Sequence, residues 1–154
     1  MKNRASTDSD RKTALAALET SLSTPIVSGE LAAWVGEVQK AWEEASQQIC
    51  HAITSVHPGQ YEEMGEEDLE LLPQIERLKL EDEAIERERE HLDQIVERDA
   101  QHVPKLEPDE AKAQRHVQNL IDEGLAFITR VRKQEVAVET WLVEAFNRDR
   151  GTAD

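Results

Sequence analysis

The chain has 154 residues, with 18 Lys and Arg against 33 Asp and Glu, which gives a formal net charge of −15. Hydrophobic residues make up 38% of it, enough for one core, and the length fits a single domain. Such an acidic charge excludes ordinary binding to the phosphate backbone of nucleic acids and disfavours docking on anionic lipid.

The sequence lacks the features of membrane-spanning and secreted proteins. No stretch approaches the ~20 apolar residues that a membrane-spanning helix needs. The N-terminal segment MKNRASTDSDRK has no apolar signal core. The lone cysteine, Cys50, excludes an intramolecular disulfide and is typical of a reducing compartment. We therefore expect a cytoplasmic protein that does not bind membranes or nucleic acid.

Four amphipathic helices are predicted, because strand patterns are nearly absent and apolar residues recur every three or four positions. The first is expected over residues 10–23. Residues 1–8 are expected to form a flexible tail, and residues 9–154 a single helical domain. The second helix is expected over residues 28–57, with Ser28 as its N-cap.

The remaining helix ends are predicted from proline and glycine. Pro58-Gly59 is expected to end the second helix, and an acidic connector follows it. The third helix is expected over residues 68–103 and is closed by Pro104. The fourth is expected over residues 108–150, with Gly151 as a C-cap.

Short connectors make sequential helices antiparallel neighbours. The predicted fold is therefore an all-α, up-down-up-down antiparallel four-helix bundle in which the first helix is the shortest. Residues in the middle of the apolar stripes are expected to form the core. These are Trp42, Ile49, Leu78, Ile85, Ile128 and Leu142.

Some charged residues share the inward phase of the apolar stripes. The third helix turns Asp82 and Arg89 inward, and we expect Arg89 at the height of Gly36 and Gly124, beside a carboxylate. Buried charge is costly unless it is paired, hydrogen-bonded or metal-bound. Two interpretations of these charged residues stay open. They lie at the edges of the apolar stripes and extend their side chains to solvent, or they form a polar layer inside the bundle. That layer would contain Asp82, Glu135, Glu139 and Gln48.

The patterns typical of enzymes are absent from the sequence. Three of the five histidines, His51, His91 and His102, point away from the apolar stripes, and His57 and His116 lie at stripe boundaries. No two histidines pair at a spacing of four residues, as a bundle metal site would favour. There is no Gly-rich phosphate loop, nucleophile elbow, CxxC or HExxH. We therefore expect a protein that is not an enzyme.

Four segments carry a family resemblance: LAAWVGEVQKAWEEA, GQYEEM, LLPQIERLKLEDEAI and the ending EVAVETWLVEAFNRDRGTAD. In this order they resemble bacterial hemerythrin-like (HHE-type) proteins, and EAFNRD and RGTAD are the most family-like pieces. The resemblance spans most of the chain. It implies a four-helix bundle whose family carries a di-iron site built from histidines and carboxylates.

Carried onto this chain, the resemblance implies a degenerate metal site. Histidine positions of the family fall at Cys50, Asp82 and Gln134. Carboxylates remain at several ligand positions, which leaves a vestigial metal site. Its residues would be Asp82, Glu135, Glu139, Glu144 and Asp149. No cofactor is expected, and iron or another divalent metal is the alternative.

Three functional hypotheses follow. The leading one is a non-enzymatic structural or regulatory module that binds a basic protein partner, because the acidic charge favours fast, salt-sensitive association. The second is a metal-binding or oxygen-sensing protein that uses a carboxylate-rich site. The third is an acidic oligomerising bundle unrelated to hemerythrins, and a homodimer is compatible with each.

Overall fold

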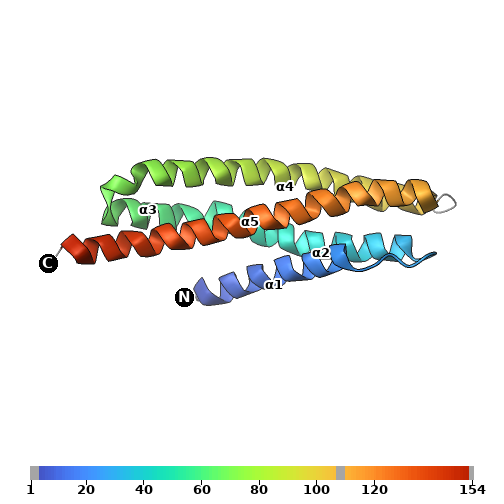
Figure 1. The fold of residues 1–154 in the computed structure, drawn as a ribbon, viewed down its shortest axis with the longest axis horizontal. Helices are drawn as coiled ribbons and strands as arrows, with labels where there is room; N and C mark the ends of the chain where they lie inside the picture. Colours follow the sequence, from blue (N-terminus) through green and yellow to red (C-terminus); the bar gives the residue numbers. More distant parts are fainter. Residues whose placement is uncertain (1–3, 107–109, 153–154) are drawn as a thin grey trace. The chain divides into compact units, whose positions relative to one another are not determined.

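The computed structural model describes residues 4–106 and 110–152, which form helices joined by short turns (Figure 1). The helices are α1 (Arg4–Ser23), α2 (Leu31–His51), α3 (His57–Glu67), α4 (Leu72–Leu106) and α5 (Glu110–Thr152). A π-helical turn, η1 (Ala52–Val56), connects α2 to α3, and a 3-10 turn, η2 (Leu69–Leu71), precedes α4. No strand occurs in these ranges. The predicted all-α four-helix bundle is confirmed, with α2, η1 and α3 forming one of its four helical paths.

The beginnings of the first two helices differ from the predicted ones. The second path begins at Leu31 and not at Ser28, because Gly29 has a φ of +85°. This left-handed backbone conformation suits glycine in a turn and cannot belong to a right-handed helix. The first helix begins at Arg4, so its first turn lies within residues 1–8.

Two prolines and one glycine lie inside helical paths, although we predicted each of them at a helix end. The chain stays helical past Pro58, α4 contains Pro104 and ends at Leu106, and α5 passes through Gly151 to its end. Proline removes one backbone N–H and therefore interrupts the hydrogen bonds locally without always ending the helix. Glycine adopts right-handed helical angles as well as left-handed ones.

The bundle divides into two units, and α4 and α5 contribute to both. Unit 1 comprises Met1–Ile49 and Glu88–Ile128, and unit 2 comprises Cys50–Arg87 and Thr129–Asp154. Unit 1 therefore contains α1 and most of α2, whereas unit 2 contains η1, α3 and η2. None of the described helices has the length and apolar content that crossing a bilayer requires.

The core of unit 1 contains the predicted residues Trp42, Ile49 and Ile128, all of which are buried. The Trp42 and Phe127 rings pack in a tilted arrangement with their centroids 5.5 Å apart. Gly124 is buried where α5 meets α1, and a side chain at this position would collide with Leu22. Glycine therefore allows these two helices to approach closely.

Arg89 lies mostly inside unit 1, as predicted, with 14% of its side chain exposed. Its Nη1 donates to Asp93 Oδ2 at 3.2 Å and to Ser46 Oγ at 3.0 Å. The predicted carboxylate partner is therefore present. The expected role of Gly36 is wrong, because this glycine is exposed and nothing lies within 4 Å of a Cβ placed on it.

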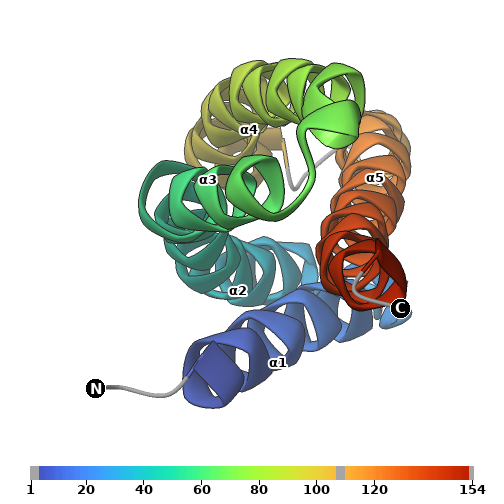
Figure 2. The same cartoon turned by 90° about the vertical axis from the view of Figure 1, so that its left-hand side faces the viewer.

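The core of unit 2 is formed by residues of α3, η2, α4 and α5. Figure 2 shows the turn that reverses the chain between α3 and α4. The buried members of this core are Tyr61, Met64, Leu71, Ile75, Leu78, Val138 and Ala145. The predicted core residue Leu78 belongs to this cluster, and Ile85, another predicted core residue of unit 2, is also buried. Leu142 was also expected in the core, and it is half-buried against this cluster.

Candidate functional site

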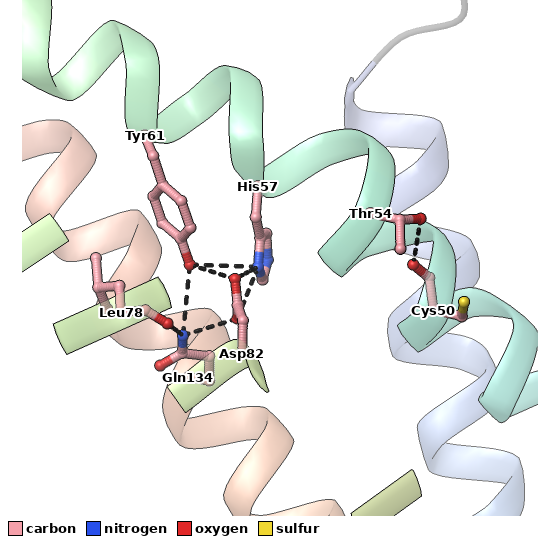
Figure 3. A network of polar contacts seen from close by, with 7 residues as sticks. All are labelled: Cys50, Thr54, His57, Tyr61, Leu78, Asp82 and Gln134. Carbon is pink, nitrogen blue, oxygen red and sulfur yellow. Dashed lines mark hydrogen bonds and ion pairs between the residues drawn. The ribbon is translucent and has the colours of Figure 1, made fainter. Parts of the chain in front are cut away.

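Four polar side chains are buried together in unit 2, and we refer to them as the polar cluster (Figure 3). They are His57 and Tyr61 on α3, Asp82 on α4 and Gln134 on α5. Each of them is at most 5% exposed. Burial of this many polar groups is stable only when their hydrogen bonds are satisfied, so the contacts within the cluster determine its chemistry.

Asp82 is the centre of the polar cluster, because its carboxylate accepts hydrogen bonds from the three other residues. The Nδ1 of His57 lies 2.9 Å from Oδ2 and 3.0 Å from Oδ1. The Tyr61 hydroxyl donates to Oδ2 at 2.6 Å, and Gln134 Nε2 donates to Oδ1 at 2.9 Å. Three donors thus solvate a carboxylate that water cannot reach.

Gln134 completes the network by contacting the backbone. Its Nε2 also donates to the carbonyl oxygen of Leu78 at 2.8 Å. No side-chain nitrogen or oxygen of the four cluster residues is buried without a hydrogen-bond partner. The polar cluster is therefore a satisfied network, which is the condition under which buried polar groups stabilise a unique packing.

The π-helical turn η1 explains why His57 faces inward. The His57 N–H bonds to the Ala52 carbonyl five residues earlier, where an α-helix would use the fourth. Pro58 has no N–H to give to the Thr54 carbonyl, which favours this wider turn. The Thr54 hydroxyl donates to the Cys50 carbonyl at 2.7 Å and satisfies another backbone acceptor of the turn.

The wider turn changes which residues of the helical path are buried. Ala52, the first residue of the turn, is buried, and the next fully buried residue is His57, five positions later. The ordinary spacing of four resumes with Tyr61. One additional residue in the turn therefore places both His57 and Tyr61 on the face that packs against α4 and α5.

Tyr61 is held as a neutral phenol. Burial raises its pKa above the ordinary value of about 10, and the hydrogen bond to the Asp82 carboxylate and the charge of that carboxylate raise it further. The ionised form would place two negative oxygens side by side in the core. Tyr61 therefore acts as a hydrogen-bond donor throughout the neutral range.

We expect alkaline titration to show this directly, because Tyr61 is the only tyrosine of the chain. Phenolate absorbance should not develop near pH ~10, the ordinary tyrosine pKa. It should appear at higher pH, together with loss of helical circular dichroism. The folded state binds the phenolic proton more tightly than the unfolded state, so stability falls as pH rises above the unfolded pKa. Phenolate formation near pH ~10 in a fully helical protein would contradict the arrangement.

The structure places the predicted metal ligands in different environments. Asp82 is buried, as predicted from its helical phase. Glu135 and Glu144 are half-buried, and Glu139 is exposed. The side chain of Asp149 lies outside the described residues. Among the described residues, no three His, Cys, Asp or Glu side chains are grouped as metal ligands.

Of the predicted polar layer, Asp82 is buried, Glu135 is half-buried and Glu139 is exposed. On α5 the inward residue is Gln134, next to the predicted Glu135. One residue corresponds to about 100° of helical rotation, so a phase error of one position exchanges a carboxylate for an amide. Gln48, the remaining predicted member, bonds to Glu44 on the exposed side of α2.

Among the five histidines, the predicted burial is wrong only for His57, which belongs to the polar cluster. His51, His91 and His102 are exposed, as their phases predicted, and His116 is half-buried. His57 was assigned to a stripe boundary and is buried. The sequence signal that could have found it is the histidine directly before a proline inside a long amphipathic segment, where a wider helical turn shifts the phase.

The residues of the polar cluster do not fit a di-iron centre. Such a centre needs several histidine and carboxylate ligands that converge with free lone pairs. The cluster has one histidine, and its Nδ1 is directed at Asp82. Gln134 directs an amide N–H, which is a hydrogen-bond donor, at the same carboxylate. The Asp82 oxygens are already used by three donors.

Comparisons of the chain with models of protein families, with curated proteins and with solved structures find no match.

Proposed function

We propose that this chain is a hemerythrin-like helical-bundle protein in which a buried hydrogen-bond network replaces a lost di-iron site. In this proposal it acts as a non-enzymatic structural or regulatory module that binds a basic protein partner. A cytoplasmic location is part of the proposal, since its lone cysteine suits a reducing compartment.

The observation that carries the proposal is the contact between Asp82 and Gln134. The resemblance puts two metal-ligating histidines of the family at these positions, which are 52 residues apart on α4 and α5. Gln134 Nε2 lies 2.9 Å from Asp82 Oδ1. Positions that contribute to one di-iron site in the family are expected to be neighbours in this chain, and this pair is in contact. The contact supports the resemblance by an observation that the alignment did not use.

The chemistry of the polar cluster supports the loss of the metal. A metal ion would neutralise the buried carboxylate of Asp82. Here hydrogen bonds from His57, Tyr61 and Gln134 provide that stabilisation. Cys50 is the third position at which the resemblance puts a histidine of the family. It is half-buried, and its side chain lies away from the polar cluster (Figure 3).

Two further observations favour a binding module over an enzyme. The cluster residues are nearly inaccessible, so a substrate could not reach them without opening the bundle. The net charge of −15 favours a basic partner, because opposite charges accelerate and orient association.

Metal analysis of freshly purified protein tests the proposal. We expect far less than one equivalent of iron, manganese or zinc per chain, and no charge-transfer band in the optical spectrum under oxygen. The Asp82→Asn variant serves as control, because its metal content should equal that of the unmodified chain. About two irons per chain, lost in Asp82→Asn, would overturn the proposal and favour the oxygen-sensing alternative.

A further inference from the structure

The turn between α3 and α4 is rich in acidic residues and contains no Lys or Arg. From residue 50 to residue 76 the sequence has seven Asp and Glu and no Lys or Arg. The acidic residues are Glu62, Glu63, Glu66, Glu67, Asp68, Glu70 and Glu76. We define residues 62–72 as the acidic turn, which contains six of the seven and lies in unit 2 (Figure 2).

The acidic turn also exposes two leucines. Leu69 is 74% exposed, the highest value among the exposed large hydrophobic residues of the described chain, and Leu72 is 50% exposed. Single exposed apolar residues are common on protein surfaces. Leu69 and Leu72 are three positions apart, and both exposed side chains are flanked in the sequence by the carboxylates of the acidic turn.

The backbone of the turn fixes these leucines outside. Asp68 Oδ1 accepts a hydrogen bond from the Glu70 N–H at 3.0 Å, and the Leu71 N–H donates to the Asp68 carbonyl at 3.1 Å. These bonds hold the 3-10 turn that directs Leu71 into the core, where it is 2% exposed. Because Leu71 fills the interior, Leu69 and Leu72 remain on the surface.

We propose that the acidic turn is the docking surface for a basic amphipathic helix of a partner protein. Apolar residues of that helix would cover Leu69 and Leu72, and its Lys and Arg would face the surrounding carboxylates. This inference rests on the proposed function and assigns its partner to a place on the chain.

Charge complementarity favours a basic helix over a second copy of the chain, nucleic acid or anionic lipid. A second copy docked by two-fold symmetry would set the acidic turn against itself, and like charges oppose such an interface. Nucleic acid and anionic lipid carry the same sign of charge as the turn. A basic helix satisfies both the apolar and the acidic part of the surface.

A synthetic peptide tests the proposal without knowledge of the natural partner. The probe is a Leu/Lys peptide with Leu at helical positions i, i+3, i+4 and i+7, titrated into the full-length ¹⁵N-labelled protein. A peptide of the same composition in scrambled order, which has no apolar face, is the control. We expect chemical-shift changes at residues 62–76 and at least roughly tenfold weaker binding of the scrambled peptide.

Two pairs of variants separate the surface from net charge and from general hydrophobicity. Glu62→Gln/Glu66→Gln/Glu70→Gln should weaken probe binding about tenfold. Glu30→Gln/Glu37→Gln/Glu43→Gln removes the same charge from exposed residues of unit 1. This variant should change the affinity for the probe by less than about twofold. Leu69→Ser/Leu72→Ser should weaken binding, whereas Val136→Ser/Val143→Ser, at exposed positions of α5, should not.

Equal losses in both acidic variants, or shifts centred outside residues 62–76, would overturn the docking surface. Circular dichroism should show that all four variants retain their helicity, because every substituted side chain is exposed. If the protein is metal-free and this test fails, the docking surface is wrong and the loss of the metal site is unaffected. If the protein holds iron, the proposed function fails whatever the peptide does.

Discussion

Replacing Asp82 with Ala should lower the free energy of unfolding by about 3–5 kcal/mol, because several buried hydrogen bonds are lost at once and each buried donor left unsatisfied costs about 1–3 kcal/mol. The substitution removes the shared acceptor of His57, Tyr61 and Gln134, and Gln134 keeps its other bond, to the Leu78 carbonyl. Each of these groups would lose a hydrogen bond that water cannot replace. Urea denaturation followed by circular dichroism measures the change.

Glu83→Ala is the matched control for Asp82→Ala, because it removes an exposed carboxylate from the next position of α4. Its effect should lie within ~0.5 kcal/mol of zero. Asp82→Asn should give an intermediate loss, since the amide oxygen keeps one acceptor while its N–H group opposes that of Gln134. A loss below about 1 kcal/mol in Asp82→Ala would mean that the polar cluster is not formed.

Leu78→Ala should destabilise the protein by about 2–5 kcal/mol, because it leaves a cavity among the buried side chains of unit 2. Leu78 is buried against the core of α3 and α5, and its carbonyl also accepts the Gln134 hydrogen bond. Leu80→Ala provides the control on the same helix, since Leu80 is exposed. Equal effects of the two substitutions in urea denaturation would show that the inward face of α4 is assigned incorrectly.

The fold and most of the core could be predicted because apolar periodicity reports burial directly. Ile49, Leu78 and Ile85 recur at spacings that keep one face of each helix apolar, and all three are buried. Asp82 was found by the same rule, as a polar residue on an apolar face. On α4, the phase of the apolar stripe therefore extends correctly from Leu78 to Ile85.

The polar cluster could only be predicted in part, because its other members depend on small changes in phase. His57 lies one position beyond the expected stripe, since the π-helical turn adds a residue that periodicity does not detect. On α5, Gln134 and Glu135 are adjacent, and a long helix with polar residues near its stripe does not fix the phase to within one position. Hydrogen bonding between helices also depends on register, which the pattern along each helix does not contain.

The π-helical turn makes the composition of the protein interior depend on how one short segment winds. If the same residues of Ala52–Val56 wound as an ordinary α-helix, every later residue of α3 would rotate by about 100° relative to α2, and the imidazole and phenol would leave the inward face together. Deleting one residue from this segment would instead restore ordinary winding with both rings still facing inward, because a spacing of four in an α-helix covers the same face as a spacing of five across the turn. The additional residue and the wider turn therefore compensate each other. Only a change in one without the other would exchange an interior built around a carboxylate and its donors for one without them.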